Sequence, residues 1–174
     1  MAHRCPCGVD VDTRGLHGLS CRSSYGRGAR HHQLNDVVYR ALRRADIPAT
    51  KEPTGLLRTD NKRPDGLTLV PWREGRCLTW DATVVDTFAT SYLGYTTALA
   101  GGAAEEASRR KEVKYARIAE THLFTAVAVE TMGPIGQAAT AFLSELGRRL
   151  TAITGDQRDT GYSFQRVIGH GTTI

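Results

Sequence analysis

Two aspartates in strand-like surroundings are the residues of this chain most suggestive of chemistry. Asp65 follows Arg63-Pro64, and Asp81 lies sixteen residues later in the run Leu78–Asp86. An ionised carboxylate in apolar surroundings is costly unless a positive charge compensates for it. A divalent cation compensates for two carboxylates at once, and two aspartates near a lysine can form a metal-dependent phosphodiesterase. The alternative is that Asp65 begins a turn, because Pro-Asp-Gly is a favourable turn sequence, and that Asp81 pairs with an arginine.

Two lysines on a later helix could complete such a site. The sequence predicts a helix over Ala103–Glu120, in which Lys111 and Lys114 share one face with apolar residues a turn before and a turn after them. A lysine on the face that packs against a sheet must extend towards solvent or meet an anion. We therefore expect these lysines either to reach Asp81 or to be solvated.

Cysteines and a histidine near the start of the chain predict a second, structural metal site. Their pattern is Cys5-x-Cys7-x9-His17-x3-Cys21, which supplies the four ligands of a closed tetrahedral Zn²⁺ site. In an intracellular chain a metal explains such a cluster better than disulfides do. The alternative is a set of unrelated thiols, and His3 could replace one of the ligands.

The charge of the chain favours a polyanionic partner. The 174 residues carry a net charge of +5, with a pI near 9.2. Six arginines and a single acid lie between Arg22 and Arg44, and arginine suits phosphate because its planar fork donates paired hydrogen bonds. DNA is therefore the favoured partner over a merely solvated helix face. No apolar stretch could span a bilayer and the N-terminus lacks a secretory signal, so we expect an intracellular or nuclear protein without membrane association.

The elements that must position these residues form one α/β domain after the cysteine-rich segment. We assign residues 1–30 to a zinc knuckle with a basic loop and residues 31–174 to the larger domain. Because side chains alternate along a strand, Asp81 shares its face with Thr83, whereas Trp80 faces the other way. Hydrophobic periodicity predicts a helix over 31–45, strands over 49–53, 67–70 and 77–86, a helix over 103–120, a strand over 124–129, a helix over 137–153 and a short helix near 162–168.

The order α-β-β-β-α-β, with Pro-Asp before the second strand and an acid in the third, resembles the restriction-endonuclease-like nucleases, the PD-(D/E)XK superfamily. Within it, the chain most resembles the endonuclease domain at the C-terminus of site-specific non-LTR retrotransposon polyproteins. The matching residues lie between roughly residues 5 and 131 and comprise the Cys5, Cys7, His17, Cys21 knuckle, Arg30-His31, Arg63-Pro64-Asp65 with Asp81, and Lys111 with Lys114-Tyr115.

The resemblance implies a mixed central sheet flanked by helices and a Mg²⁺- or Mn²⁺-dependent endonuclease that nicks DNA as a partner of reverse transcription. Asp65 and Asp81 would bind the metal, and Glu52 would be an auxiliary ligand or contact the metal through water. A lysine would orient or activate the attacking water and offset charge on the phosphate. The residues expected to hold nucleic acid are Arg27, Arg30, His31 and Arg63.

Two departures from the superfamily pattern bear on activity, and one of them is a somewhat long spacer between Asp65 and Asp81. Thr83 stands where the usual Asp/Glu-x-Lys has its lysine, so Lys114, or with less support Lys111, must replace it. The chain also looks like the terminal piece of a longer polyprotein, which makes a reverse transcriptase domain or retroelement RNA an expected partner. The alternative function is a non-catalytic nucleic-acid-binding module with a decayed nuclease fold, and a third option is a protein-interaction domain whose carboxylates are structural.

Overall fold

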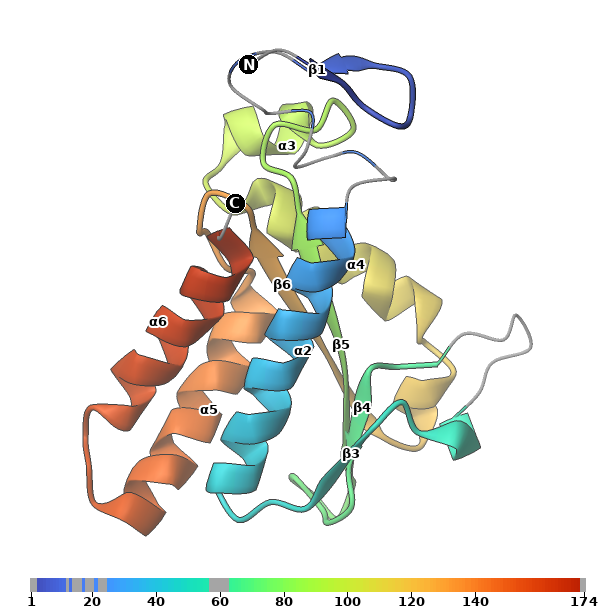
Figure 1. The fold of residues 1–174 in the computed structure, drawn as a ribbon. Coiled ribbons are helices and arrows are strands. Elements are labelled where there is room, and N and C mark those ends of the chain that lie inside the picture. Colours follow the sequence, from blue (N-terminus) through green and yellow to red (C-terminus); the bar gives the residue numbers. More distant parts are fainter. Residues whose placement is uncertain are drawn as a thin grey trace.

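The computed structural model is a mixed α/β fold built on a four-stranded sheet (Figure 1). It describes residues 3–11, 13, 17, 21, 25–56 and 63–172, and for residues 25, 27 and 170–172 it describes the backbone alone. The strands lie in the order β3-β4-β5-β6; β3, β4 and β5 pair antiparallel, and β5 and β6 pair parallel. Their bounds are Ala49–Lys51 for β3, Gly66–Thr68 for β4, Leu78–Val85 for β5 and Leu123–Glu130 for β6. The expected mixed sheet flanked by helices is confirmed at this level.

The helices divide between the two faces of the sheet. Helices α2 (Tyr25–Arg44), α5 (Gln137–Thr154) and α6 (Asp159–Thr172) lie together on one face, and α4 (Gly102–Lys114) lies on the other (Figure 1). The short α3 (Leu93–Ala98) precedes α4 in the crossover that the parallel pairing of β5 and β6 requires. None of the described helices is long and apolar enough to cross a bilayer.

Trp80 lies at the centre of the larger core, between the sheet and α2. Its side chain is fully buried, and its Nε1 donates a hydrogen bond of 2.8 Å to Oδ1 of Asn35 on α2. Leu78 and Ala82 share its face and join the same apolar cluster. Because Asp81 is next to Trp80 on the strand, its side chain faces α4 instead.

Helix α4 lies close to the sheet because its buried apolar side chains are small. Those packed against β5 and β6 are Ala103, Ala104 and Ala107. The first turn is held by Glu130 of β6, whose Oε1 accepts hydrogen bonds from the N–H groups of the first two alanines, at 3.0 and 3.2 Å. This carboxylate satisfies N-terminal amides that have no partner within the helix, so it fixes where α4 begins relative to the sheet.

Several element boundaries differ from those expected from the sequence. Helix α2 begins at Tyr25 rather than at His31, so it continues through Gly26 and Gly28, whose low helix propensity favoured a loop. The helix predicted to reach Glu120 ends at Lys114. There Tyr115 leaves helical geometry (φ −107°, ψ 17°) and its side chain is buried. A separate 3₁₀ turn follows at Ile118–Glu120, and α3 was not predicted.

The cysteine-rich segment contains a small antiparallel ribbon of its own. Strand β1 (His3–Arg4) pairs with β2 (Asp10–Val11), and the turn between them passes through Gly8 at φ +91°. A left-handed φ is readily adopted by glycine. The ribbon thereby places Cys5 and Cys7 in one tight turn, at the top of the view in Figure 1.

Candidate active site

Asp65 and Asp81 meet because β4 and β5 are antiparallel neighbours. The N–H of Asp65 donates to the carbonyl oxygen of Trp80 at 2.9 Å, which places the first acid beside the second. Oδ2 of Asp65 accepts a hydrogen bond of 2.7 Å from the N–H of Ala82. Ligand atoms of both acids and of His31 lie within 4.8 Å of one another. These three side chains form a group that could hold a metal ion.

His31 reaches this group from α2. Its Nε2 lies 3.0 Å from Oδ2 of Asp65. His31 was predicted to contact nucleic acid, and its bond to Asp65 was not anticipated. A usable signal was present, because Asn35 lies four residues later and residues four apart share a helix face. That face of α2 is the one turned towards β5.

The two lysines of α4 both reach Asp81, at different distances. Nζ of Lys111 lies 2.9 Å from Oδ1 and 3.2 Å from Oδ2 of Asp81. Nζ of Lys114 lies 3.7 Å from Oδ2, and it donates a shorter hydrogen bond of 2.6 Å to the hydroxyl of Tyr115. Asp81 is 3% exposed. A buried carboxylate therefore has Lys111 as its direct partner and Lys114 as a more distant one.

Tyr115 joins α4 to the segment that carries Asp65. Its hydroxyl donates a hydrogen bond of 2.9 Å to the carbonyl oxygen of Arg63. Its ring packs on Phe124 of β6 with 5.0 Å between ring centroids. The residue that ends α4 thus anchors the Arg63-Pro64-Asp65 segment against the helix.

Burial and neighbouring charges move the pKa values of the two acids in opposite directions. Burial raises the pKa of Asp65, but the hydrogen bond and charge of His31, followed by the N–H of Ala82, outweigh it and leave that pKa lowered. For Asp81 burial is again the largest influence, and with the negative charge of Asp65 it outweighs Lys111, so the pKa is raised. The hydrogen bond to Asp65 raises the pKa of His31 despite burial. The pKa values of two carboxylates that share one site are driven apart in this way.

The remaining predicted site residues lie outside this group. Glu52 forms an ion pair with Arg63, and its side chain is 58% exposed rather than directed at the two aspartates. Arg30 is buried in α2, with 6% of its surface exposed. The side chain of Arg27 lies outside the described part of the chain. The structure therefore brings together the two acids, both lysines and His31.

A second group of ligand atoms lies in the cysteine-rich segment. The ligand atoms of Cys5, Cys7, His17 and Cys21 lie within 4.8 Å of one another. The two sulfurs of Cys5 and Cys21 are 3.6 Å apart, and Sγ of Cys7 is 3.1 Å from Nε2 of His17. Tetrahedral ligands at a Zn–S length of about 2.3 Å would have their sulfurs about 3.8 Å apart. The cluster could hold a metal such as zinc.

The thiol of Cys7 in this cluster has a lowered pKa. The N–H of Val9, followed by the thiol of Cys5, hydrogen-bonds to it and lowers its pKa to about 6. The thiolate is the form that binds a metal. The environment of Cys7 therefore favours the ligand form near neutral pH.

Comparison with known proteins does not place the chain in a family. No protein-family model matches it. The curated proteins likewise contain no match to it.

Proposed function

We propose that this chain is a metal-dependent endonuclease that hydrolyses phosphodiester bonds of DNA, of the restriction-endonuclease-like kind found in non-LTR retrotransposons. The observation that carries the proposal is the convergence of Asp65, Asp81 and the ammonium group of Lys111. Two carboxylates beside a cation are the groups that metal-assisted hydrolysis of a phosphodiester requires. The order α2-β3-β4-β5-α4-β6, interrupted by the short α3, supports it.

The donor set fits a divalent cation that prefers oxygen ligands. Asp65 and Asp81 would hold the ion, and His31 offers an additional nitrogen that Mn²⁺ accepts more readily than Mg²⁺ does. When bound, such a cation polarises a phosphoryl oxygen and lowers the pKa of a bound water. We therefore propose Mg²⁺ or Mn²⁺ as the cofactor.

The side chains around the acids have distinct roles in this proposal. Lys111 supplies an ammonium group that can hydrogen-bond a phosphate oxygen and stabilise the negative charge that develops during hydrolysis. Lys114 and Tyr115 are positioning residues, because they hold the segment of Asp65 against α4. Lys111 thus takes the place of the lysine that the superfamily pattern has where this chain has Thr83.

Nicking of supercoiled plasmid by the purified chain tests the proposal. We expect nicking with Mn²⁺ or Mg²⁺ and none with EDTA, and a rate at least about 100-fold lower in Asp65→Asn and in Asp81→Asn, because each change removes a charged group from the reaction centre. Glu112→Gln is the matched control, since Glu112 is an exposed acid next to Lys111 in the sequence. Equal nicking by the wild type and both aspartate variants would exclude this site.

The second candidate function is a non-catalytic nucleic-acid-binding module. It is favoured because each acid already has a basic partner within the chain. His31 pairs with Asp65 and Lys111 pairs with Asp81, so the two negative charges are balanced without a metal ion. It predicts salt-dependent DNA binding that Asp81→Asn leaves unchanged, together with no metal-dependent nicking. Salt-dependent DNA binding that Asp81→Asn leaves unchanged, without any nicking, would identify the chain as this binding module.

The wider setting follows from the same proposal. The Cys5, Cys7, His17 and Cys21 cluster would hold a structural Zn²⁺ ahead of the nuclease domain. DNA in the nucleus would be the substrate, and a reverse transcriptase domain or retroelement RNA a partner. Co-purification of the chain with such a domain tests the partner separately from nicking.

A further inference from the structure

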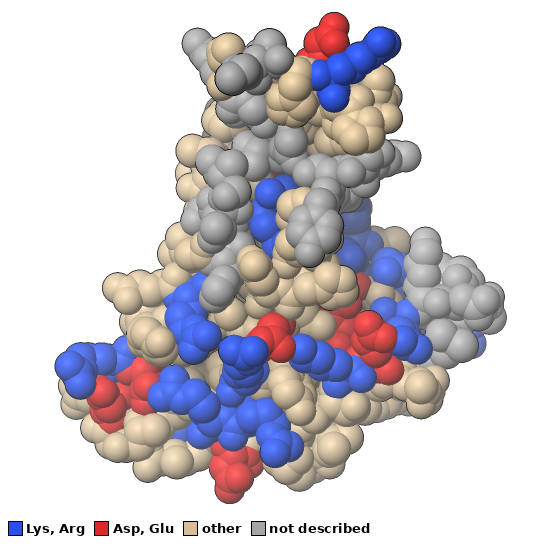
Figure 2. All heavy atoms as spheres, in the orientation of Figure 1, with Lys and Arg blue, Asp and Glu red and all other residues tan. Residues whose placement is uncertain are grey.

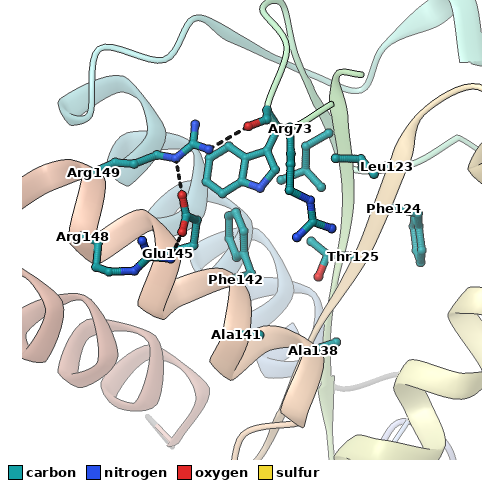
Figure 3. Close-up of a pocket in the computed structure, with 12 residues that line it drawn as sticks. Arg73, Leu123, Phe124, Thr125, Ala138, Ala141, Phe142, Glu145, Arg148 and Arg149 are labelled. Atoms are coloured by element: carbon teal, nitrogen blue, oxygen red, sulfur yellow. Dashed lines mark hydrogen bonds and ion pairs between the residues drawn. The ribbon is translucent and has the colours of Figure 1, made fainter. Parts of the chain in front are cut away.

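A hollow of about 600 Å³ lies at the edge of the sheet, and neither aspartate lines it (Figure 3). It is bounded by the turn that follows β4, by the start of β6 and by α5. Pockets of roughly 300–1,000 Å³ are the size that holds small organic ligands. The hollow is therefore large enough for one nucleotide unit.

One wall of the hollow is aromatic and firmly held. The rings of Trp72 and Phe142 lie 5.5 Å apart between centroids, with 45° between their planes. The guanidinium of Arg149 lies 3.8 Å from the centroid of Trp72 and donates a hydrogen bond of 2.7 Å to the carbonyl oxygen of the same residue. Phe142 is only 5% exposed, so the partly exposed ring of Trp72 is the part of this wall that can meet a base, whatever the base is.

The rim of the hollow is basic. Arg73 and Arg148 have side chains that are 70% and 73% exposed, and Figure 3 shows Arg73 extending from its turn towards Thr125 of β6. Glu145 is the only acid among the described residues that line the hollow, and it pairs with both Arg148 and Arg149. Arg73 also lies 3.7 Å from Glu74, so three arginines face two carboxylates and leave one positive charge in excess, which suits a phosphodiester.

The hollow lies close to the candidate active site across the sheet. Phe124 of β6 lines it and also packs on Tyr115, at 5.0 Å between ring centroids. In the parallel register Asp81 is paired with Ala126, two residues beyond Phe124. Two residues along one strand and one strand across correspond to about 8 Å between backbone positions. A strand of nucleic acid at Asp81 could continue round the edge of the sheet at this point.

We propose that this hollow binds one unpaired nucleotide of a single-stranded segment, with its base against Trp72 and its phosphate at Arg73 and Arg148. A duplex cannot offer a base in this way, because its bases are stacked and paired. The proposal deepens the proposed function, since it rests on nucleic acid being the substrate. It adds that the substrate contains single-stranded nucleic acid next to the cleavage point.

Oligonucleotide binding without added Mg²⁺ or Mn²⁺, which leaves the proposed structural Zn²⁺ in place, tests this inference without any cleavage. The probes are a fluorescein-labelled oligothymidylate of about 12 nucleotides and a duplex of the same length, read by anisotropy. We expect the double substitution Arg73→Ala, Arg148→Ala to weaken single-strand binding at least about 10-fold and duplex binding less than threefold, because only the single strand places a base in the hollow. Arg158→Ala is the matched control, because Arg158 is an exposed arginine paired with a neighbouring acid outside this hollow.

Tryptophan fluorescence supplies an independent measurement. Trp80 is fully buried, whereas Trp72 is partly exposed at the hollow, so a stacked base should quench Trp72. We expect quenching by the unlabelled single strand and its loss in Trp72→Phe. Equal weakening of single-strand and duplex binding, or unchanged binding of both without quenching, would overturn the inference. A dimer in sedimentation that these substitutions dissolve would assign the hollow to a second copy of the chain, and would also overturn it.

The outcome is separable from that of the proposed function. The binding experiments use the wild type and the Asp81→Asn variant side by side without added Mg²⁺ or Mn²⁺. Selective single-strand binding by a chain that never nicks plasmid would support the nucleotide site in the hollow and exclude the nuclease function. Nicking without selective single-strand binding would support the nuclease function and exclude the nucleotide site.

Discussion

At the scale of single residues, Asp81 is shared by two lysines whose geometry separates their roles. Lys111 contacts both oxygens of the carboxylate, at 2.9 and 3.2 Å. Lys114 donates its shortest described bond to Tyr115, and its Nζ lies 4.3 Å from the centroid of that ring. The sequence favoured Lys114 as the replacement for the missing lysine, whereas the distances favour Lys111.

Substitution of each lysine by methionine distinguishes these roles. If the nuclease proposal holds, Lys111→Met should lower kcat for nicking at least about 100-fold with little change in KM, because it removes charge stabilisation at the reacting phosphate. Lys114→Met should cost about 10-fold or less, since the closest described contact of Lys114 is Tyr115 and it is the more distant partner of Asp81. Steady-state nicking kinetics give both constants, and Arg109→Met, at an exposed arginine of α4 paired with Glu106, is the control. A larger loss in Lys114→Met would reverse the assignment.

The bond between His31 and Asp65 predicts a pH-dependent contribution to stability. The pKa of His31 is raised by folding, so its stabilisation is complete below the unfolded value of about 6.5 and is lost as pH rises through the folded value. The pKa of Asp65 is lowered, so its stabilisation is present above about 4 and is lost as pH falls through the folded value. The pair therefore contributes most between about pH 4 and 6.5.

Urea unfolding in EDTA measures this contribution. The difference in unfolding free energy between the wild type and His31→Gln should be larger at about pH 5.5 than at about pH 8.5. His32→Gln is the control, because His32 is the exposed neighbour on the same helix. A difference that grows towards alkaline pH would show that His31 does not stabilise the fold as the charged partner of Asp65.

At the scale of elements, Gly66 determines how closely β4 can approach the side chain of Trp80. A Cβ added at Gly66 would lie 2.0 Å from the ring of Trp80, which is fully buried and bonded to Asn35. The ring cannot move away without breaking that bond, so Gly66→Ala should destabilise the fold by about 1–3 kcal/mol. Urea unfolding measures the loss.

Gly161→Ala is the matched control for this substitution. A Cβ at Gly161 in α6 meets nothing within 4 Å, and replacing a glycine within a helix by alanine should stabilise it by roughly 0.5–1 kcal/mol. Equal effects of the two substitutions would mean that the contact with Trp80 does not restrict β4. Since Gly66 follows Asp65, loss of nicking in Gly66→Ala would also be expected.

The elements that the sequence predicted best are those with a strong pattern of their own. The strand over 77–86 was recognised from its β-branched and aromatic residues, and the faces of Trp80 and Asp81 from simple alternation. The end of α4 was missed because Tyr115 leaves the helix for a tertiary contact with Phe124. The start of α2 was missed because two glycines there suggest a loop. Tertiary packing decided the end of α4.

The candidate site was predictable in its residue types but not in its pairings. Asp65, Asp81 and the two lysines follow from strand and helix periodicity, and the structure places them together. Whether Lys111 or Lys114 is the nearer depends on where α4 begins, which Glu130 fixes from β6. Glu52 was assigned to the site, yet its backbone turns at φ +49° and its carboxylate meets Arg63. Such outcomes depend on contacts between distant parts of the chain.

At the scale of the whole molecule, the cysteine-rich segment and the sheet should respond separately to metal removal. We expect elemental analysis to find one zinc ion per chain. Cys7→Ser should lose this ion, because the substitution removes one of its ligands. Chelation should raise amide hydrogen exchange over residues 3–11 while β5 and β6 stay protected. Cys77→Ser is the control, since Cys77 is the cysteine outside the cluster. Zinc lost equally in both variants would exclude this ligand set.

The distribution of charge over the molecule suggests how a long nucleic acid would lie on it. Lys and Arg side chains gather over the lower half of the view in Figure 2, where α2, α6 and β3 lie in Figure 1. Arg40, Lys51 and Arg166 all act on Asp36, and Arg44 joins α2 to α6 through Asp159. The side chains of Arg40 and Arg44 are 65% and 47% exposed. This basic surface offers more positive charge than its own acids neutralise.

Salt dependence of DNA binding tests whether the basic surface contacts phosphates. Each phosphate neutralised on duplex DNA contributes about −0.9 to the slope of log K against log salt. The double substitution Arg40→Ala, Arg166→Ala should therefore make the slope shallower by about 1–2, equally for unrelated sequences. Anisotropy titrations of a labelled duplex between about 50 and 300 mM NaCl measure the slope. Arg109→Ala, at an exposed arginine of α4 paired with Glu106, should leave it unchanged. An unchanged slope in the double variant would remove the basic surface from the DNA path and leave the arginines around the hollow as the better candidates.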